Sequence, residues 1–400
     1  MSNARKSIIV IGGGYAGLQA IEELAKNSTH QIKLFDKNPY HYMQTDVYDL
    51  IANEGDFADV TVDLCTYCTG YNENVSFVKE EVTKIDFIRK EVITDAQRYS
   101  YDYIIVGVGA RTKFYSNVKG LKEYGYGIKA LHRAMYFKQK FEMSLFKKLD
   151  EGGRYCYPLT IVVAGGGLSG VEIAAQMASF AKAFYEDNHF ICRKLNIVLV
   201  NSGDEILKGV DPKLVRQSQK RLDALGVITK TNQKVVELSE QRVVLSSGEV
   251  IEMDYMIFAG GVEPNGLIFD LDIKKTKYGY IEVDEYLRST EFEDVFAIGD
   301  CATIYHEGKA IAPTADVAEQ MGILAAKNIN ALCIQKKMKK HEIKSRGILI
   351  ALGRGYAVAK LFGINIKGYS AYLLKKLVEK VYAYKLEKRS KVGCQKIFND

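Results

Sequence analysis

The chain has 400 residues, of which 47% are hydrophobic and 26% are charged, and its formal net charge is +6. These proportions are ordinary for a globular protein, and a chain of this length can bury a large core in two or three domains. No apolar run approaches the roughly 20 residues of a transmembrane helix, so the sequence excludes a membrane-spanning protein.

The first predicted unit begins with an apolar strand at Ser7–Ile11, which leads into the sequence GGGYAG and a helical pattern. In this G-x-G-x-x-G turn, Gly12 permits the tight change from strand to helix, and Gly14 lets a pyrophosphate approach the backbone. Gly17 lets the helix and the strand pack closely, while the free N–H groups of the helix face the phosphates. The turn therefore predicts a dinucleotide site.

The next elements extend this unit into a βαβ arrangement. The helix is expected from about Ala16 to Lys26, and the following strand, Gln31–Phe35, ends in Asp36. An acid at this position can accept hydrogen bonds from the ribose hydroxyls of an adenosine. A later apolar strand in the segment YDYIIVGVGA ends at Gly109, which lets the chain turn close to a cofactor.

A second unit repeats this order. The strand Leu159–Ala164 leads into GGGLSG, in which Gly165, Gly167 and Gly170 have the spacing of the first turn. One such match is weak, but two in one chain indicate two dinucleotides held by two βαβ units. A protein that binds two redox dinucleotides usually passes a hydride between them.

The second unit continues with a helix from about Gly170 to Glu186 and a strand, Asn196–Val200, that ends in Asn201. An apolar strand in MDYMIFAGG then reaches Gly260, and the later segment VFAIGDCA places Asp300 at a strand-to-helix turn. The predicted fold is therefore α/β, with two Rossmann-like dinucleotide-binding domains followed by a C-terminal amphipathic-helix segment.

The remaining elements follow the second unit. A helix is expected at about Ala312–Leu332, and a lysine-rich linker follows at residues 336–340. Strand patterns then cover Ile348–Leu352 and Ala357–Leu361, and a final helix is expected near Tyr369–Leu386.

The final helix is basic and amphipathic. Its apolar residues recur at spacings of three and four, and its charged residues fall on the opposite side: Leu374, Leu377, Val378, Val381 and Tyr384 against Lys375, Lys376, Glu379 and Lys380. Residues 360–400 hold ten Lys or Arg and three Asp or Glu. We predict that this helix binds an anionic membrane surface. The alternatives are packing on the body with the charged face in solvent, and a homodimer contact. No nucleic-acid-reading motif is present, so no nucleic acid is expected.

The ordered motifs GGGYAGL, YDYIIVGVG, GGGLSGVEIA, MDYMIFAGG and VFAIGDCA resemble those of the two-dinucleotide-fold flavoprotein reductases. Within that superfamily, the segments APTADVAEQMG and GRGYAVAKLFGINIKGYSAYLL resemble the type II NADH:quinone oxidoreductases, which are single-subunit NADH dehydrogenases that pump no protons. The resemblance covers nearly the whole chain. It implies non-covalent FAD, NADH as co-substrate, a membrane quinone as acceptor, and a peripheral place on the cytoplasmic side of the membrane.

The resemblance also implies a division of the chain. The FAD-binding domain would comprise residues 1–118 and 283–335, with the NADH-binding domain inserted at residues 119–282. Residues 336–400 would form the basic, membrane-associating segment.

The family's site residues carry over to matching positions. Gly12, Gly14 and Gly17 would face the FAD pyrophosphate, with Asp36 on its ribose and Asp300 at its ribityl or pyrophosphate region.

For the second nucleotide, Gly165, Gly167 and Gly170 would face the NADH pyrophosphate. Glu172 would lie near the nicotinamide and the flavin, where it is predicted to be catalytic.

Three positions depart from the family pattern. Asn201 stands where the family usually has Glu, which removes a repulsion against a 2′-phosphate; because no Arg follows, NADH is still preferred over NADPH. On the quinone-side helix, Gln320 fits the family but Asp316 replaces a glutamine. Asp316 would relay a proton to a reduced quinone, or it indicates a different acceptor. The flavin-side segment NPYHYMQTD lacks the family's proline-containing continuation.

The cysteines and histidines leave one alternative open. Seven scattered cysteines and no room for a signal peptide before Ser7 indicate a reducing cytoplasm. Cys65 and Cys68 form a lone C-x-x-C, for which a chance surface position is favoured over a redox pair or half of a zinc site. The histidines show no ligand spacing, and for His41 a core or solvated role is favoured. A sulfide:quinone reductase or a reductase with another acceptor remains the alternative, as does a nucleotide-binding flavoprotein that signals redox state with little turnover.

Overall fold

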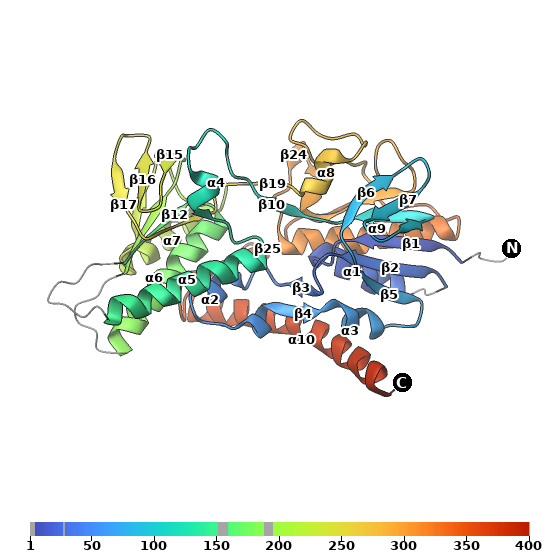
Figure 1. Ribbon diagram of the computed structural model, residues 1–400, viewed down its shortest axis with the longest axis horizontal. Helices are drawn as coiled ribbons and strands as arrows, with labels where there is room; N and C mark the ends of the chain where they lie inside the picture. The colour runs from blue at the N-terminus through green and yellow to red at the C-terminus, as the bar shows by residue number, and fades with distance from the viewer. Residues whose placement is uncertain (1–4, 27–28, 151–158, 188–194, 400) are drawn as a thin grey trace.

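Two parallel sheets, each covered by helices, form the two lobes seen in Figure 1. The structure is a computed structural model, and it describes residues 5–26, 29–150, 159–187 and 195–399. The central strands of both sheets are apolar and buried on both faces, which is the pattern expected of strands covered by crossover helices.

The first sheet forms the core of the right-hand lobe in Figure 1. Helices α1 (Tyr15–Ala25) and α9 (Ala315–Cys333) cover one of its faces, and Gly322 permits their close approach because a Cβ there would lie 2.1 Å from the carbonyl oxygen of Ala16. The strands follow the order β21 (Val295–Ala297), β9 (Tyr103–Val106), β1 (Ser7–Ile11), β2 (Gln31–Asp36) and β5 (Val75–Lys79).

The second sheet repeats this arrangement in the left-hand lobe. Its order is β11 (Gly125–Tyr126), β18 (Tyr255–Phe258), β12 (Leu159–Ala164), β13 (Leu195–Val200) and β14 (Ile228–Lys230). Helices α5 (Leu131–Asp150), α6 (Leu168–Asp187) and α7 (Pro212–Ala224) pack with it. In the first sheet, the strand before the glycine turn, β1, lies between β2 and β9. In the second sheet, β12 lies between the corresponding strands β13 and β18, so the predicted internal repeat is confirmed.

The two lobes are joined by an antiparallel pair, β10 (Ala110–Thr112) and β19 (Val262–Pro264). Beyond β19 the chain returns at once to the first lobe. Ile268, Leu271 and Ile273, which the predicted division placed in the inserted unit, pack in a core cluster with residues of the first sheet.

Short sheets and helices lie around the two main sheets. In the first lobe they are β3 (Tyr40–Tyr42), β4 (Thr61–Asp63), β6 (Val82–Asp86), β7 (Glu91–Thr94), β8 (Arg98–Ser100), β20 (Ile281–Glu282), β22 (Ala302–Thr303), β23 (Tyr305–His306), β24 (Lys309–Ala310), α3 (Leu64–Thr69), α8 (Gly266–Asp270) and the short 3-10 helix Gly299–Cys301. Strands β20 and β22 pair in parallel, and the other short strands of this lobe pair antiparallel. In the second lobe they are β15 (Val235–Leu238), β16 (Arg242–Leu245), β17 (Val250–Glu252) and α4 (Leu121–Tyr124). Helix α2 (Val47–Ile51) and the 3-10 helix Phe57–Val60 follow β3 in the chain but pack in the core of the second lobe.

The C-terminal segment differs from its prediction. Strands β25 (Gly347–Ala351) and β26 (Ala357–Leu361) are joined by a third strand, β27 (Ile364–Gly368), which the sequence analysis missed. Helix α10 (Tyr369–Asn399) continues well beyond the predicted end and runs beneath both lobes in Figure 1. Across the described part of the chain, every helix is too short or too polar to cross a bilayer.

Candidate active site

The first glycine turn has the geometry of a phosphate-binding loop. Gly12 has φ +103°, and a Cβ added to Gly17 would lie 1.9 Å from the carbonyl oxygen of Gly12. No atom beyond its chain neighbours lies within 4 Å of a Cβ position on Gly14, which immediately precedes α1. The turn therefore presents open backbone at a helix N-terminus, which suits a pyrophosphate.

Asp36 completes this turn. Its Oδ2 accepts a hydrogen bond from the N–H of Gly13 (2.8 Å), and its Oδ1 accepts one from the N–H of Asn38 (2.8 Å). Burial raises the pKa of the Asp36 carboxyl, and these hydrogen bonds oppose that rise. The side chain is thereby fixed at the end of β2, the position at which the sequence predicts a hydrogen-bond acceptor for the ribose hydroxyls.

The second turn repeats the first. Gly165 has φ +129°, and a Cβ on Gly170 would lie 1.8 Å from the carbonyl oxygen of Gly165. Gly167, like Gly14, faces open space. Asn201 stands where Asp36 stands in the first fold, and its Nδ2 donates to the carbonyl oxygens of Glu205 (2.7 Å) and Gly203 (3.3 Å).

The remaining predicted cofactor residues lie around these turns. Gly109 has φ +68° and faces open space, whereas a Cβ on Gly260 would meet the ring of Phe258 at 2.7 Å. Asp300 forms an ion pair with Lys129 (Nζ to Oδ2, 2.7 Å), which comes from the second lobe. Sequence reasoning missed Lys129 because an isolated lysine carries no motif.

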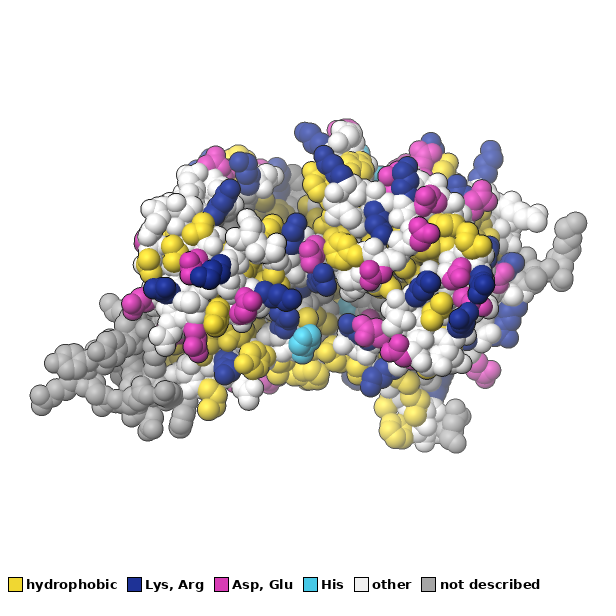
Figure 2. Space-filling view, turned by 45° about the horizontal axis from the view of Figure 1, so that its top comes forward, with side chains coloured by type: hydrophobic (Ala, Val, Ile, Leu, Met, Phe, Trp, Pro, Cys, Tyr) yellow, Lys and Arg dark blue, Asp and Glu magenta, His cyan; other side chains and the backbone are white. Residues whose placement is uncertain are grey.

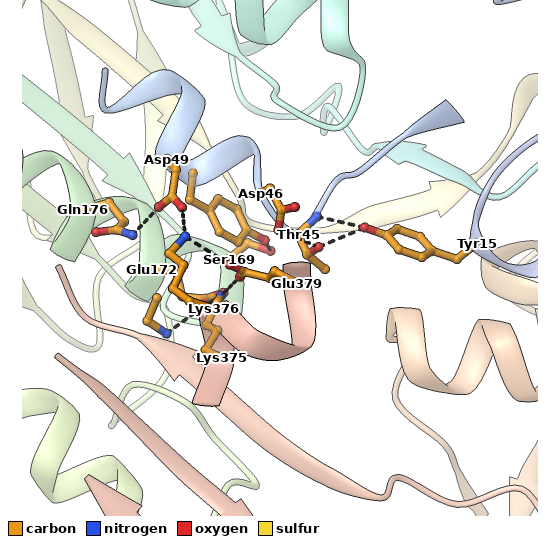
Figure 3. Close-up of polar contacts among 12 residues, drawn as sticks. Tyr15, Thr45, Asp46, Asp49, Ser169, Glu172, Gln176, Lys375, Lys376 and Glu379 are labelled. Atoms are coloured by element: carbon orange, nitrogen blue, oxygen red, sulfur yellow. Dashed lines mark hydrogen bonds and ion pairs between the residues drawn. The ribbon is translucent and has the colours of Figure 1, made fainter. Parts of the chain in front are cut away.

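Glu172 lies in a group of buried charges where α2, α6 and α10 meet (Figure 3). Its Oε1 accepts hydrogen bonds from the Nζ of Lys375 (2.8 Å) and from the N–H of Ala351 (2.8 Å). Lys375 also lies 3.4 Å from Glu379, and the side chains of Glu172 and Lys375 are 7% and 11% exposed. Burial would lower the pKa of Lys375, but the two carboxylates outweigh it and raise that pKa.

The same group contains a second lysine. The Nζ of Lys376 contacts Asp49 and lies 3.0 Å from Glu379, while Gln176 donates to Asp49. Sequence reasoning missed Asp49 because nothing in its local pattern distinguishes it from a solvated acid.

Beside these charges, Figure 3 shows Asp46 next to Thr45 and Tyr15. The Thr45 hydroxyl donates to Asp46 (3.0 Å) and lies 2.9 Å from the Tyr15 hydroxyl. Burial, together with the nearby Glu379, raises the pKa of Asp46 to about 7. Asp46 is the last residue of the segment NPYHYMQTD, which departs from the family pattern.

The two quinone-side residues form a separate network. Asp316 is held by Arg346, whose Nε lies 2.5 Å from Oδ1 and whose N–H donates to Oδ2 (3.1 Å). Gln320 also donates to Asp316 (3.1 Å) and to the carbonyl oxygen of Lys344 (3.1 Å). Asp316 and Gln320 therefore contact each other, and Asp316 lies in an ion pair that the sequence analysis did not anticipate.

Residues 6–322 match the model of the family described as pyridine nucleotide-disulphide oxidoreductase. The chain belongs to that family. Two similar relatives are the type II NADH:quinone oxidoreductases of Staphylococcus saprophyticus and Staphylococcus aureus. Each is 27% identical over 394 residues, which cover 96% of this chain and 97% of the relative.

Solved structures show the same fold. NDH2 from Plasmodium falciparum in complex with NADH matches with a TM-score of 0.84 and 18% identity, over 97% of each chain. The sulfide:quinone oxidoreductase from Aquifex aeolicus matches with a TM-score of 0.81 and 17% identity, over 96% of this chain and 92% of that chain.

In this pyridine nucleotide-disulphide oxidoreductase, the described cysteines are not arranged as a redox pair. Cys65 is exposed and Cys68 is buried on the same short helix, and both are free. Burial raises the pKa of the Cys301 thiol to about 12, and its Sγ donates to the carbonyl oxygen of Val106 (3.2 Å), so Cys301 is a packed residue as predicted.

Cys156, Cys192 and His189 lie outside the described residues. Among the described residues, no His, Cys, Asp or Glu cluster could hold a metal ion.

The prediction of which face of helix α10 meets solvent was wrong. Lys375, Lys376 and Glu379, which were expected on the solvent side, face the body. The predicted apolar side faces outward instead, with Leu377 57% exposed and Tyr384 63% exposed. The reason is that buried carboxylates on α2 and α6 pair with the lysines, which no local pattern in α10 reveals.

Proposed function

We propose that this chain is an FAD-dependent NADH:quinone oxidoreductase that pumps no protons. The observation that carries the proposal is the pair of matching phosphate-binding turns, one on each parallel sheet, in lobes joined through β10 and β19. The hollow between the lobes in Figure 2 is the place where two bound nucleotides would approach each other. Similarity to the type II NADH:quinone oxidoreductases over 96% of the chain supports the choice of substrates.

The residues of the first fold suit FAD. The open backbone of Gly14 at the start of α1 would receive its pyrophosphate, and Asp36 would bind its adenosine ribose. Asp300, at the turn after β21, would bind the region between the pyrophosphate and the flavin. Lys129, which pairs with Asp300, would hold this side chain in place.

The second fold would hold NADH by the same means. Gly167 would receive the pyrophosphate, and the Oδ1 of Asn201 would accept from the ribose because the Nδ2 of that amide is already bonded to the loop. Glu172 follows this turn on α6, at the junction with α10, where its buried carboxylate is held by Lys375.

The overall reaction is NADH + H⁺ + quinone → NAD⁺ + quinol. When bound, the flavin supplies the hydride acceptor and the two-electron donor, while the protein supplies orientation and electrostatics. The second proton of the quinol comes from solvent. Asp46, with a pKa of about 7, is suited to pass that proton because both of its protonation states are populated at neutral pH.

The outer face of α10 would bring the enzyme to its quinone. This face exposes Leu373, Leu377, Val378, Val381 and Tyr384 together with Lys380, Lys385, Lys388 and Lys391. Apolar side chains beside lysines suit the surface of an anionic bilayer. We therefore place the protein at the cytoplasmic face of a membrane, where NADH is available; a second copy covering this face is the competing outcome.

The decisive experiment is anaerobic reduction of the bound flavin by NADH, followed by reoxidation by a panel of quinones. We expect rapid reoxidation by quinones and none by sulfur compounds. Acid precipitation should release FAD, at one per chain, into the supernatant. Release of FMN, flavin retained on the pellet, or flavin oxidised only by polysulfide or a soluble acceptor would refute the proposal.

A further inference from the structure

Both backbone polar groups of Gly13 are held by side chains. The N–H of Gly13 donates to Asp36 (2.8 Å), and its carbonyl oxygen lies 2.8 Å from the Nδ1 of His41. His41 is fully buried. Because a trans peptide is planar, its C=O and N–H groups point in opposite directions. Fixing the carbonyl of Gly13 therefore also fixes where the N–H of Gly14 points, and this is the residue that faces open space.

The second glycine turn has the same anchor with a different donor. The carbonyl oxygen of Gly166 accepts a hydrogen bond from the backbone N–H of Leu207 (2.7 Å). The carbonyl group at the second glycine of the turn is thus held in both folds. In the second fold the main chain holds it, and in the first fold a single side chain does.

His41 also connects this turn to helix α10. Its Nε2 lies 3.1 Å from the hydroxyl of Tyr382, whose ring lies 5.1 Å from that of Tyr15, the first residue of α1. Burial lowers the pKa of His41 to about 4, so the ring is neutral. A neutral ring that donates from Nδ1 to Gly13 has an acceptor at Nε2, so the Tyr382 hydroxyl donates to it. A chain of hydrogen bonds therefore runs from α10 to the glycine turn.

We propose that His41 is a positioning residue of the FAD site, which aims the N–H of Gly14 at the pyrophosphate and is itself oriented by Tyr382. This inference rests on the proposed FAD site in the first fold. It assigns a role to a histidine for which sequence reasoning favoured a core or solvated place. It also makes flavin affinity depend on the docking of α10.

Two amide substitutions separate the contacts of His41. In His41→Asn, the amide N–H lies near the place of Nδ1 and can still donate to Gly13. In His41→Gln, the longer side chain puts the amide near Nε2, so the Tyr382 contact is kept and the Gly13 contact is lost. The measurement is the dissociation constant of FAD from each full-length flavin-free protein, with NADH binding as a check that the chain is folded.

We expect His41→Asn to bind FAD within about threefold of the parent and His41→Gln to bind it about tenfold more weakly, since one buried hydrogen bond is lost. Tyr382→Phe should weaken FAD binding by about threefold, whereas Tyr384→Phe, an exposed tyrosine of the same helix, should leave it unchanged. NADH binding should be the same in all variants.

Equal FAD affinity in the Asn and Gln variants, or a stronger loss in the Asn variant, would overturn the role of His41. If one of these two variants fails to bind NADH, the comparison of Tyr382→Phe with Tyr384→Phe decides, and equal FAD affinity there refutes the inference. A parent protein that binds no FAD would instead refute the proposed FAD site.

Discussion

The amino group of Lys375 on α10 lies 2.8 Å from the carboxylate of Glu172 on α6, and both side chains are almost fully buried. This pair ties the C-terminal helix to the helix that follows the second glycine turn. It lies on the face of α10 whose spacing pattern had indicated contact with solvent. The apolar face of α10 is consequently left outside.

Breaking this pair should destabilise the protein strongly. Lys375→Met leaves Glu172 buried without its partner, which we expect to lower the free energy of unfolding by about 3–5 kcal/mol. Denaturant unfolding measures the loss. Lys380→Met, at an exposed position of the same helix, is the control and should change stability by about 0.5 kcal/mol or less. The double variant Lys375→Met with Glu172→Gln should recover part of the loss; no recovery would contradict the pairing.

The two glycine turns and the central strands of both sheets were predictable because their signals are local. A run such as Ser7–Ile11 is apolar at successive residues because both faces are buried, and Gly12 and Gly165 occupy positive φ that the spacing of the motif implies. The orientation of α10 was not predictable from its own sequence. It depends on Glu172, 203 residues away, and on Asp49, 327 residues away.

The extent of α10 also depends on distant contacts. A Cβ on Gly393 would lie 1.8 Å from the carbonyl oxygen of Thr66, and one on Gly70 would lie 2.2 Å from the carbonyl oxygen of Arg389. The second half of the helix is thus fixed by close packing on α3 rather than by its own amphipathic pattern. The pairing of Asp316 with Arg346 is of the same kind, because it joins α9 to a linker without regular structure.

Nucleotide preference should follow from Asn201. The parent should reduce its flavin faster with NADH than with NADPH, since no Arg follows Asn201 to bind a 2′-phosphate. Asn201→Glu adds a charge that repels the 2′-phosphate and should widen the preference by about tenfold. Stopped-flow reduction with each nucleotide measures it. Faster reduction of the parent by NADPH would refute this assignment.

Membrane binding should depend on the outer face of α10. Removing the whole helix is a poor test, because Lys375 and Tyr382 contact the body. Leu377→Ser with Val381→Ser changes only exposed side chains and should weaken co-sedimentation with anionic liposomes, since burial of apolar surface contributes roughly 25 cal/mol per Å². High salt should weaken binding of the parent without abolishing it. Unchanged liposome binding with loss of a dimer would assign this face to a second copy.

The cysteines should be dispensable for turnover. Cys65→Ser and Cys68→Ser should leave quinone reduction by NADH within about threefold of the parent, because both thiols are free within the described part of the chain. Cys68 is buried, so its variant is expected to lose some stability but not activity. Loss of turnover in the Cys65 variant, or efficient quinone reduction by sulfide in the parent, would favour the sulfide:quinone alternative.

Acid stability should report the burial of His41. Its pKa is lowered from 6.5 to about 4 by burial, whereas in the unfolded chain it keeps the ordinary value. Below pH 6.5 the unfolded chain therefore binds a proton that the folded protein does not. The free energy of unfolding therefore falls as the pH drops from 6.5 towards 4, by at most about 1.4 kcal/mol per pH unit for this one group.

The variant His41→Asn tests this, because it has no such titration. Measured on flavin-free protein by denaturant unfolding, the difference in stability between the parent and His41→Asn should be constant above pH 7 and should shift in favour of the variant by roughly 3 kcal/mol near pH 4. A difference that stays constant over the whole range would mean that His41 is accessible to protons in the folded state, and that the hydrogen bond from Tyr382 does not persist in solution.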